Sequence, residues 1–518
     1  MVPQNPAKLA VRPLLAIWAA LAMALVAFSY VFTLLLAAAC VYLPFVLFSA
    51  YAGLQTFAVF VCGIVVSTVI LWSLIPRRDR FSAPGPRLQA SEHPRLFSEL
   101  EGIAKALNEP MPREVYLIGD LNSWVAERGG VMGVGSRRVM GLGLPLVRIL
   151  TISQFRAVLA HEFGHFYTGD TRLLPWVHKT REAMVRTLIN LGSESLAEAF
   201  ARFQLAALVY HLAVAALVGY WKLFMRITQA ISRRQEYRAD ELAGHVAGPR
   251  ALIEGLCAIH GASAALPSFW QTQLVPAIEA GCRPSIADGF AYFIAVPGIA
   301  KAISGHMEKE LREATTDPYG THPPLRDRLA AIRRLGLGRQ EPDNTLAITL
   351  LDGVDGMELQ LLQTINPDRN VSSLRSVSWE RVGTEVYIPA WRDLARGYAS
   401  LLADYTVERL PEAIANLDEI ARRMRDPQGM LLTRQQRVER AAQLLWRALA
   451  AALWDDGWQL HAAPGEFHVE RGEYRIAPAE IVAEIRSGAI TAIDWSQRCK
   501  AAGISALPLT PSAGGRAL

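Results

Sequence analysis

The sequence predicts a mainly α-helical membrane protein with a small β-sheet. Three observations predict this fold class. No charged residue occurs between Leu14 and Ile75, helical patterns dominate from there to about residue 335, and amphipathic helices followed by alternating segments come after Gly336. We therefore expect an N-terminal transmembrane helical hairpin (1–80), a central helical domain (81–335) and an α+β C-terminal extension (336–518).

The composition excludes several classes of protein. Of the 518 residues, 51% are hydrophobic and 19% are charged, which excludes a disordered chain. The net charge of +5 is too small to predict a nucleic-acid partner. The five cysteines include no closely spaced pair, so neither a disulfide framework nor a cysteine-based zinc ribbon is expected.

The uncharged segment is long enough for two membrane helices, because one span needs about 20 apolar residues. Pro44 and the softer stretch 49–56 predict a break between a helix near 14–48 and a second near 54–75. A cleaved signal peptide is the alternative, but its apolar core would end after about 7–15 residues, whereas this one continues.

Positive charges predict the orientation of the hairpin. Lys8 and Arg12 precede the first helix, and three arginines follow the second, at positions 77, 78 and 80. Basic residues concentrate on the cytoplasmic side of a membrane. We expect a multi-pass protein of the inner (cytoplasmic) membrane, with the central domain facing the cytoplasm.

The segment from Thr151 carries the chemistry. Thr151 and Gln154 form a capping-box pattern at the start of a predicted helix. Within the helix, His161-Glu162-Phe163-Gly164-His165 is an H-E-x-x-H sequence. Side chains four residues apart share one helical face, so His161 and His165 can bind one zinc ion. Glu162 lies beside the remaining coordination position, where it can act as general base.

Glu236 is the predicted third ligand. Two histidines and one glutamate leave a fourth position for water, which is typical of a catalytic zinc site. Asp240 lies one helical turn after Glu236 and can accept the free N–H of a ligating histidine. Asp170, which follows His165 by five residues, is a second candidate for that role.

Three motifs together resemble one family, the membrane zinc metallopeptidases related to HtpX and the CAAX prenyl protease. They are H-E-F-G-H-x4-D at 161–170, E-Y-R-A-D at 236–240 and T-H-P-P-L-R-D-R-L at 321–329. The resemblance covers about residues 85–335. It implies a zincin-type metallopeptidase domain with one zinc ion bound by His161, His165 and Glu236, and Glu162 as general base.

The resemblance also implies further site residues. His322 and Arg328 fall in the third motif and could stabilise an oxyanion. For His322 a helix-start position before two prolines is an equal alternative, and for Arg328 a structural ion pair. A strand before the zinc helix is expected to pair with an extended substrate. Its predicted substrate-binding residues are Asn122, Ser123, Trp124 and Val125.

Residues 203–221 form a second apolar segment, with His211 as its only ionisable residue. The zinc ligands must lie on one side of the membrane, so the number of crossings between His165 and Glu236 must be even. Basic residues flank the segment on both sides. We expect a membrane-associated helix, or a hairpin with residues 182–200 turning near Asn190, that packs on the first two spans.

The C-terminal extension is predicted to contain helices at 343–366 and 391–455. A strand is expected around Val382–Ile388, a small α/β unit after Gly457 and a disordered tail after Pro508. No second set of metal ligands is expected, because the remaining histidines lack ligand spacing.

The function predicted from these observations is a zinc-dependent endopeptidase that hydrolyses membrane or membrane-proximal proteins, as in protein quality control. Its partners would be polypeptide substrates and the lipid bilayer. A CAAX-type prenyl-peptide protease is the related alternative, and a non-catalytic zinc-stabilised membrane scaffold is the alternative from another class. The oligomeric state is left open.

Overall fold

The computed structural model describes residues 13–131, 135–167, 174–336, 341–425 and 432–510. The chain forms two compact units. The first contains Met1–Gly261 and Gly305–Thr364, and the second contains Ala262–Ser304 and Ile365–Leu518. The fold class is mainly α-helical with small sheets, as predicted. The predicted domain boundaries at residues 80 and 335 stay predictions.

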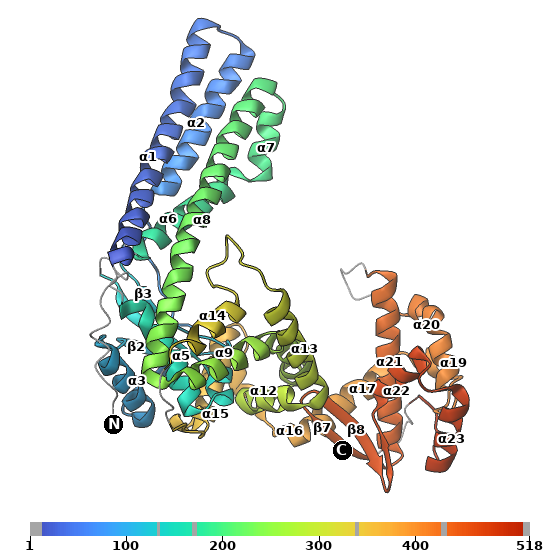
Figure 1. Ribbon diagram of the computed structural model, residues 1–518. Coiled ribbons are helices and arrows are strands. Elements are labelled where there is room, and N and C mark those ends of the chain that lie inside the picture. Colours follow the sequence, from blue (N-terminus) through green and yellow to red (C-terminus); the bar gives the residue numbers. More distant parts are fainter. Residues whose placement is uncertain (1–12, 132–134, 168–173, 337–340, 426–431, 511–518) are drawn as a thin grey trace. The chain divides into compact units, whose positions relative to one another are not determined.

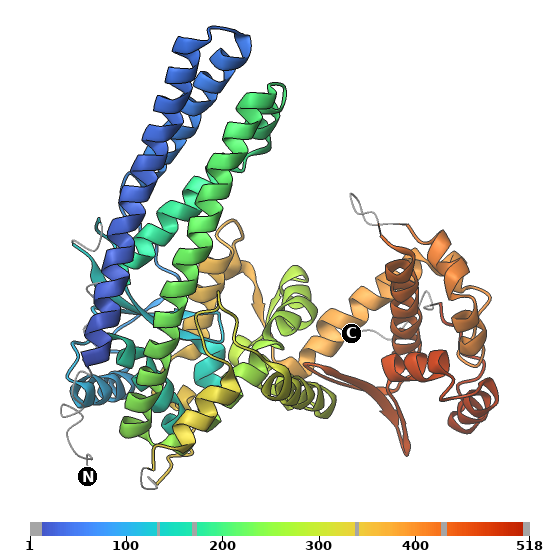
Figure 2. The same cartoon turned by 45° about the horizontal axis from the view of Figure 1, so that its top comes forward.

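The first unit begins with a bundle of apolar helices (Figure 1). Helices α1 (Pro13–Ala50) and α2 (Leu54–Leu74) confirm the predicted hairpin, and α1 continues through Pro44. They are followed later in the chain by α6 (Leu174–Leu191), α7 (Glu194–Ala201) and α8 (Gln204–Ala247). Figures 1 and 2 both show the first part of α8 running along α1 and α2.

Helix α8 packs on the hairpin as predicted for residues 203–221. Buried side chains of α2, including Cys62 and Val66, meet Tyr210 and Leu217 of α8 in one apolar cluster. The predicted polar turn near Asn190 lies between α6 and α7. Within the described residues, three helices are long and apolar enough to cross a bilayer, namely α1, α2 and α8, and two bent helix pairs would raise the number to five.

A four-stranded sheet lies below this bundle in the first unit. It consists of β1 (Arg87–Leu88), β2 (Glu114–Ile118), β3 (Ser123–Arg128) and β4 (Arg137–Gly143), in the order β1-β2-β4-β3. Strand β2 runs parallel to β4, and β3 runs antiparallel to it. Strand β3 is therefore an edge strand, and one row of its backbone polar groups is left unpaired within the sheet.

Five more helices and a short 3₁₀ turn belong to the first unit. Their ranges are α3 (Pro94–Leu107), α4 (Leu144–Ile149), α5 (Ile152–Tyr167), α14 (Leu325–Arg333), η4 (Ala347–Leu350) and α15 (Val354–Ile365). In α3, buried Leu96, Leu100, Ile103 and Leu107 recur every three or four residues, which is the spacing of one helical face. The predicted helix at 343–366 is thus two elements, η4 and α15.

Helix α9 (Pro249–Ser263) belongs to the first unit as far as Gly261. The second unit starts with helices α10 (Leu266–Phe269), α11 (Val275–Glu279), α12 (Ile286–Ala295) and the first part of α13 (Pro297–Glu313), whose residues from Gly305 belong to the first unit. A π-helical turn, η3 (Trp270–Leu274), joins α10 to α11. Strands β5 (Cys282–Arg283) and β6 (Arg375–Ser376) pair in parallel, and η5 (Val371–Ser373) precedes β6.

The rest of the second unit is built around α21 (Arg434–Asp455), whose Leu445, Leu449 and Leu453 are fully buried. The surrounding helices are α16 (Trp379–Val382), η6 (Gly383–Tyr387), α17 (Ile388–Gly397), α18 (Ala399–Leu402), α19 (Leu410–Ala415), α20 (Leu417–Arg423), α22 (Pro478–Ser487) and α23 (Ala492–Ala502). Strands β7 (Gln459–Ala463), β8 (Glu466–Arg471) and β9 (Tyr474–Ile476) form an antiparallel sheet. The predicted helices at 391–455 and the α/β unit after Gly457 are confirmed.

The predicted strand at Val382–Ile388 is wrong. These residues lie in a helical segment that runs from α16 through the π-helical turn η6 into α17. Trp379, Val382 and Val386 are buried, three and four residues apart, so the apolar residues follow a helical period. Most of the tail predicted to be disordered, residues 511–518, lies outside the described residues, whereas Leu509 is buried and donates its N–H to the carbonyl of Tyr405.

The close contact between α1 and α2 depends on Gly63. A Cβ atom at this position would lie 1.8 Å from the carbonyl oxygen of Cys40. We expect Gly63→Leu to destabilise the protein by about 1–3 kcal/mol through overpacking. Thermal unfolding of the detergent-solubilised protein measures this, and Gly219→Leu in α8 is the control because open space surrounds Gly219. Equal unfolding temperatures for the two variants would contradict the close helix contact.

Candidate active site

Helix α5 carries the two histidines, and a capping box fixes its N-terminus. The amide N–H of Gln154 donates to Thr151 Oγ1 at 3.3 Å, and the N–H of Thr151 donates to Gln154 Oε1 at 3.1 Å. This confirms the predicted capping box. Phe155 and Phe163 are buried beneath the helix. The opposite side of α5 faces α8.

Gly164 lets α5 and α8 approach each other. A Cβ atom at Gly164 would lie 3.1 Å from the Cα atom of Ala239, tighter than ordinary van der Waals contact. Ala239 is itself fully buried. Two small residues therefore face each other where the helices cross, and the longer side chains on either side of this contact meet at one point.

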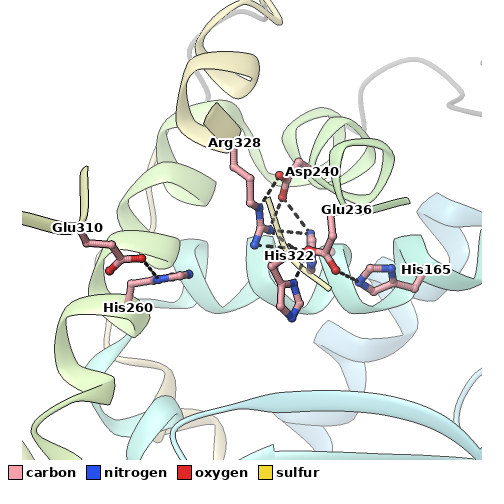
Figure 3. A network of polar contacts seen from close by, with 8 residues as sticks. His165, Glu236, Asp240, His260, Glu310, His322 and Arg328 are labelled. Atoms are coloured by element: carbon pink, nitrogen blue, oxygen red, sulfur yellow. Dashed lines mark hydrogen bonds and ion pairs between the residues drawn. The ribbon is translucent and has the colours of Figure 1, made fainter. Parts of the chain in front are cut away.

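That point is a cluster of three predicted ligands. The ligand atoms of His161, His165 and Glu236 all lie within 4.8 Å of one another. Glu236 Oε2 is 3.5 Å from His161 Nε2, and Glu236 Oε1 is 3.6 Å from His165 Nε2. Figure 3 shows the carboxylate of Glu236 directed at His165.

These separations fit a metal ion. Ligand atoms that lie 2.0–2.1 Å from a tetrahedral zinc ion are about 3.4 Å apart, close to the spacing observed here. Glu236 is buried, yet its Oε2 atom has no hydrogen bond of acceptable geometry. Two imidazole nitrogens and a carboxylate oxygen are the donors that zinc prefers. The residues present therefore fit the group that the motifs imply.

Asp240 contacts His161, the histidine that it is predicted to orient. Its Oδ1 atom lies 3.0 Å from His161 Nδ1, which leaves Nε2 directed toward Glu236. Arg328 holds the same carboxylate from the other side, with Nε 2.8 Å from Oδ2 and Nη2 2.7 Å from Oδ1. All three side chains are buried, so this bidentate ion pair is shielded from water.

His322 and Arg328 occupy different environments. Arg328 is buried, and its guanidinium forms an ion pair with Asp240, while one of its nitrogens lies 3.4 Å from Glu236. This is the structural alternative that the sequence left open. The side chain of His322 is 62% exposed, and its Nδ1 atom lies 3.0 Å from Glu236 Oε2. Of these two residues, His322 therefore presents its ring to solvent beside the ligand cluster.

Burial and neighbouring charges shift the proton equilibria of this cluster. Burial raises the pKa of Glu162 to about 7, and the charge of Glu236 adds to this rise. Burial lowers the pKa of His165 to about 4, which favours the neutral imidazole that binds metals. For His161, burial opposes protonation, but the carboxylates of Asp240 and Glu236 outweigh it and raise the pKa to about 9.

A cavity of about 460 Å³ opens beside the cluster. His165, Glu236 and His322 form one side, and residues of β3, including Val125, form another. Of the predicted substrate-binding residues, Val125 alone lines this cavity. Trp124 instead covers Gly141 on β4, where a Cβ atom would lie 2.5 Å from the indole. Asn122 and Ser123 are not among the residues that line the cavity. Asp170 lies outside the described residues.

At alternate residues of β3, the backbone N–H and C=O groups point away from β4, toward the open edge of the sheet. The N–H of Gly143 donates to the carbonyl oxygen of Asn122 at 2.9 Å, and the register continues with Trp124 opposite Gly141. Because antiparallel ladders alternate, the backbone polar groups of Asn122 and Trp124 point to β4. Those of Val125 therefore point to the open edge.

Two ion pairs in the cavity wall were missed by sequence reasoning. Asp79 accepts from Arg128 of β3 at 2.9 Å, and Glu182 accepts from Lys179 of α6 at 3.0 Å. Asp79 is the one acidic residue among the arginines that follow α2, at positions 77, 78 and 80. Its place among them was the sequence signal that could have predicted an ion pair. His260 pairs with Glu310 at 3.2 Å, apart from the cluster (Figure 3).

A second group of possible ligands lies on the β7–β8 hairpin, contrary to the expectation from sequence. His461 and His468 are opposite each other in the register, and their ligand atoms lie within 4.8 Å of those of Glu470. Glu470 already pairs with His461 at 2.6 Å, and Arg475 lies 3.3 Å from His468 Nδ1. Protein contacts account for this group without an ion.

Comparison with known proteins supports the predicted resemblance. Residues 90–335 match the model of peptidase family M48. This part of the chain is therefore similar to peptidase family M48. The matched residues include α5 and the α8 segment that carries Glu236, and so contain all three predicted ligands. The HtpX-like resemblance is confirmed, and similarity to M48 implies a metal, generally zinc.

The curated relatives are proteases of moderate similarity. Protease HtpX of Pseudomonas putida (strain GB-1) is 28% identical over 185 residues, which cover 35% of this chain and 53% of that protein. Protease HtpX homologs of Aeropyrum pernix and Syntrophobacter fumaroxidans are 29% and 26% identical, over 46% and 48% of this chain and 74% and 78% of theirs. The chain thus spans about half the length of the Pseudomonas relative.

The contact between Asp240 and His161 predicts a role in metal affinity. We expect Asp240→Asn to weaken zinc binding by about 10–100-fold, because the amide no longer fixes the imidazole or neutralises Arg328. Competition with a fluorescent zinc chelator measures this affinity. Glu241→Gln is the matched control, since it removes the neighbouring ion pair with Arg238 on the same helix. Equal zinc affinities for both variants would contradict the assigned role.

Proposed function

We propose that this membrane protein is a zinc-dependent endopeptidase. The observation that carries the proposal is the convergence of His161, His165 and Glu236 within 4.8 Å, with Glu162 next in sequence to the first ligand. Zinc, when bound there, would polarise the scissile carbonyl and lower the pKa of a coordinated water. The match of residues 90–335 to peptidase family M48 supports this chemistry.

Glu162 is the proposed general base. It accepts a proton from the attacking water and later transfers it to the leaving amine. A carboxyl pKa near 7 in the metal-free protein indicates a group for which uptake and release of a proton are both accessible at neutral pH. His322, half exposed beside Glu236, is the proposed donor to the developing oxyanion. Arg328 is proposed to position His161 through Asp240.

The outward edge of β3 is the proposed binding site for an extended substrate segment. Backbone N–H and C=O groups of Val125 point toward the cavity side of the sheet, where they can pair with a substrate backbone. Such pairing makes little demand on substrate sequence. The cavity wall also contains Asp79, five residues after the last residue of α2. This proximity favours substrates that are membrane proteins or lie close to the bilayer.

The proposed location is the inner membrane, with the peptidase domain in the cytoplasm. Basic residues at both ends of the α1–α2 hairpin support this orientation. After α5, the chain runs through α6 and α7 into the membrane region. It comes back along α8, whose second half lies in the domain that matches M48. Both zinc-binding motifs are then on the same side of the membrane.

Substitution of the general base separates catalysis from metal binding. We expect Glu162→Gln to retain zinc and to lower kcat for hydrolysis of a casein substrate by about 10²–10⁴-fold. Glu313→Gln, an exposed change on α13, controls for handling of the detergent-solubilised protein. Zinc content is measured in the same samples. Full hydrolysis by a zinc-loaded Glu162→Gln variant would exclude this mechanism and leave the scaffold alternative.

The edge of β3 is tested by removing one donor. Val125→Pro deletes an N–H that points away from β4, a position at which edge strands tolerate proline. We expect KM to rise about threefold to tenfold with a smaller change in kcat, because one backbone hydrogen bond to the substrate is lost. Val125→Ala keeps the N–H and is the matched control. If both variants show the same KM, the substrate does not bind along this edge.

A further inference from the structure

The second unit contains a cavity of about 950 Å³ that the proposed hydrolysis does not use. Its walls come from α17, α21, the β8 strand and the corner between α12 and α13. All these residues belong to the second unit, so the cavity is formed by that unit alone.

An aromatic cluster forms one wall. The ring of Trp391 stacks on Tyr387, with centroids 5.5 Å apart and an interplanar angle of 9°. The same ring meets Trp446 and Phe467 edge-on, at 5.0 Å and 4.6 Å. Aromatic rings fixed by one another offer a rigid apolar surface, which binds an apolar side chain at little entropic cost.

Arg447 is the unusual residue of this cavity. Its guanidinium carbon lies 5.2 Å from the centre of the Trp446 ring, and its Nε atom is buried without a hydrogen-bond partner. Among the described residues, no carboxylate lies within ion-pair distance of it. Burial lowers the pKa of Arg447. A partly buried cation without a counterion is costly, so the cavity is electrostatically suited to an anion.

The other charged groups of the wall do not supply that counterion. Arg475 pairs with Glu466 at 2.8 Å, so these two charges neutralise each other. Glu279 and Glu480 are exposed and therefore well solvated. The charge that lacks compensation is that of Arg447, beside the aromatic wall.

We propose that this cavity binds the free C-terminal carboxylate of a polypeptide whose last side chain is apolar. The fork of Arg447 matches a carboxylate in two parallel hydrogen bonds. The aromatic wall takes the terminal side chain. Thr272 and Gln273 also line the cavity, where Gln273 Oε1 accepts from the hydroxyl of Tyr387 at 3.0 Å. Their hydroxyl and amide groups suit a peptide backbone, whereas a fatty acid would require an apolar wall along its whole length.

Binding is measured on the full-length Glu162→Gln protein, so that the result is independent of hydrolysis. The probe is a short fluorescein-labelled peptide of glycine and serine that ends in leucine, and fluorescence anisotropy reports its affinity. We expect the free acid to bind at least about tenfold more tightly than the same peptide with a C-terminal amide. Equal binding of acid and amide would overturn the proposal.

Two further variants test the two parts of the cavity. Arg447→Gln is expected to reduce affinity for the acid at least about tenfold while leaving the unfolding temperature unchanged or higher, because an uncompensated cation is removed. Gly298→Leu is expected to block binding by filling the cavity, since open space surrounds Gly298. Arg486→Gln removes an exposed ion pair with Glu439 and is the control.

The remaining outcomes decide against the proposal. Wild-type affinity of both the Arg447→Gln and Gly298→Leu variants would show that the peptide binds elsewhere. A lower unfolding temperature for Arg447→Gln, with unchanged affinity, would assign the arginine a structural role. Binding of octanoate without binding of the peptide acid would identify a fatty-acid site instead.

Discussion

The close contact between α5 and α8 is the constraint on which the rest of the site depends. The two histidines come from one helix and Glu236 from another, so no local pattern alone can assemble them. Gly164 and Ala239 allow the helix axes to approach until the imidazoles and the carboxylate are about 3.5 Å apart. Arg328 then joins α14 to this pair through Asp240, which holds three elements together around one ligand set.

Helix α8 also connects the candidate site to the membrane. Its first half packs on the α1–α2 hairpin, and its second half carries Glu236 and Asp240. With a rise of 1.5 Å per residue, a helix of 44 residues is about 66 Å long, more than the thickness of a bilayer core. The helix therefore fixes the distance between the apolar segments and the predicted ligands, which agrees with the proposal that the substrates lie in or near the bilayer.

Local patterns in the sequence predicted most of the site. Each of these patterns lies within a single helix, where the helical period determines which side chains share a face. They are the capping box at Thr151 and the spacing of His161 and His165 in α5, and the single turn between Glu236 and Asp240 in α8. The role of Arg328 was left open, because its choice of partner depends on where α14 packs. Pairing across the β7–β8 hairpin likewise brought two histidines together that have no helical spacing.

The strand predicted at residues 382–388 was wrong for a similar reason. A short segment rich in β-branched and aromatic residues fits both periods, and burial of Trp379 and Val386 on one side decides for the helix. The burial of Arg447 could also not be predicted from the sequence, because an arginine on an amphipathic helix is ordinarily solvated. The tertiary structure places it in a cavity lined by aromatic rings.

The central claim is that one metal ion is bound jointly by His161, His165 and Glu236. X-ray absorption at the zinc edge, recorded on the purified protein and on Glu236→Ala, tests it most directly. The account predicts nitrogen and oxygen ligands at about 2.0–2.2 Å in the wild type, with one protein oxygen ligand lost and zinc affinity reduced in the variant. Sulfur ligands at about 2.3 Å, or a spectrum and zinc content that do not change in Glu236→Ala, would contradict it.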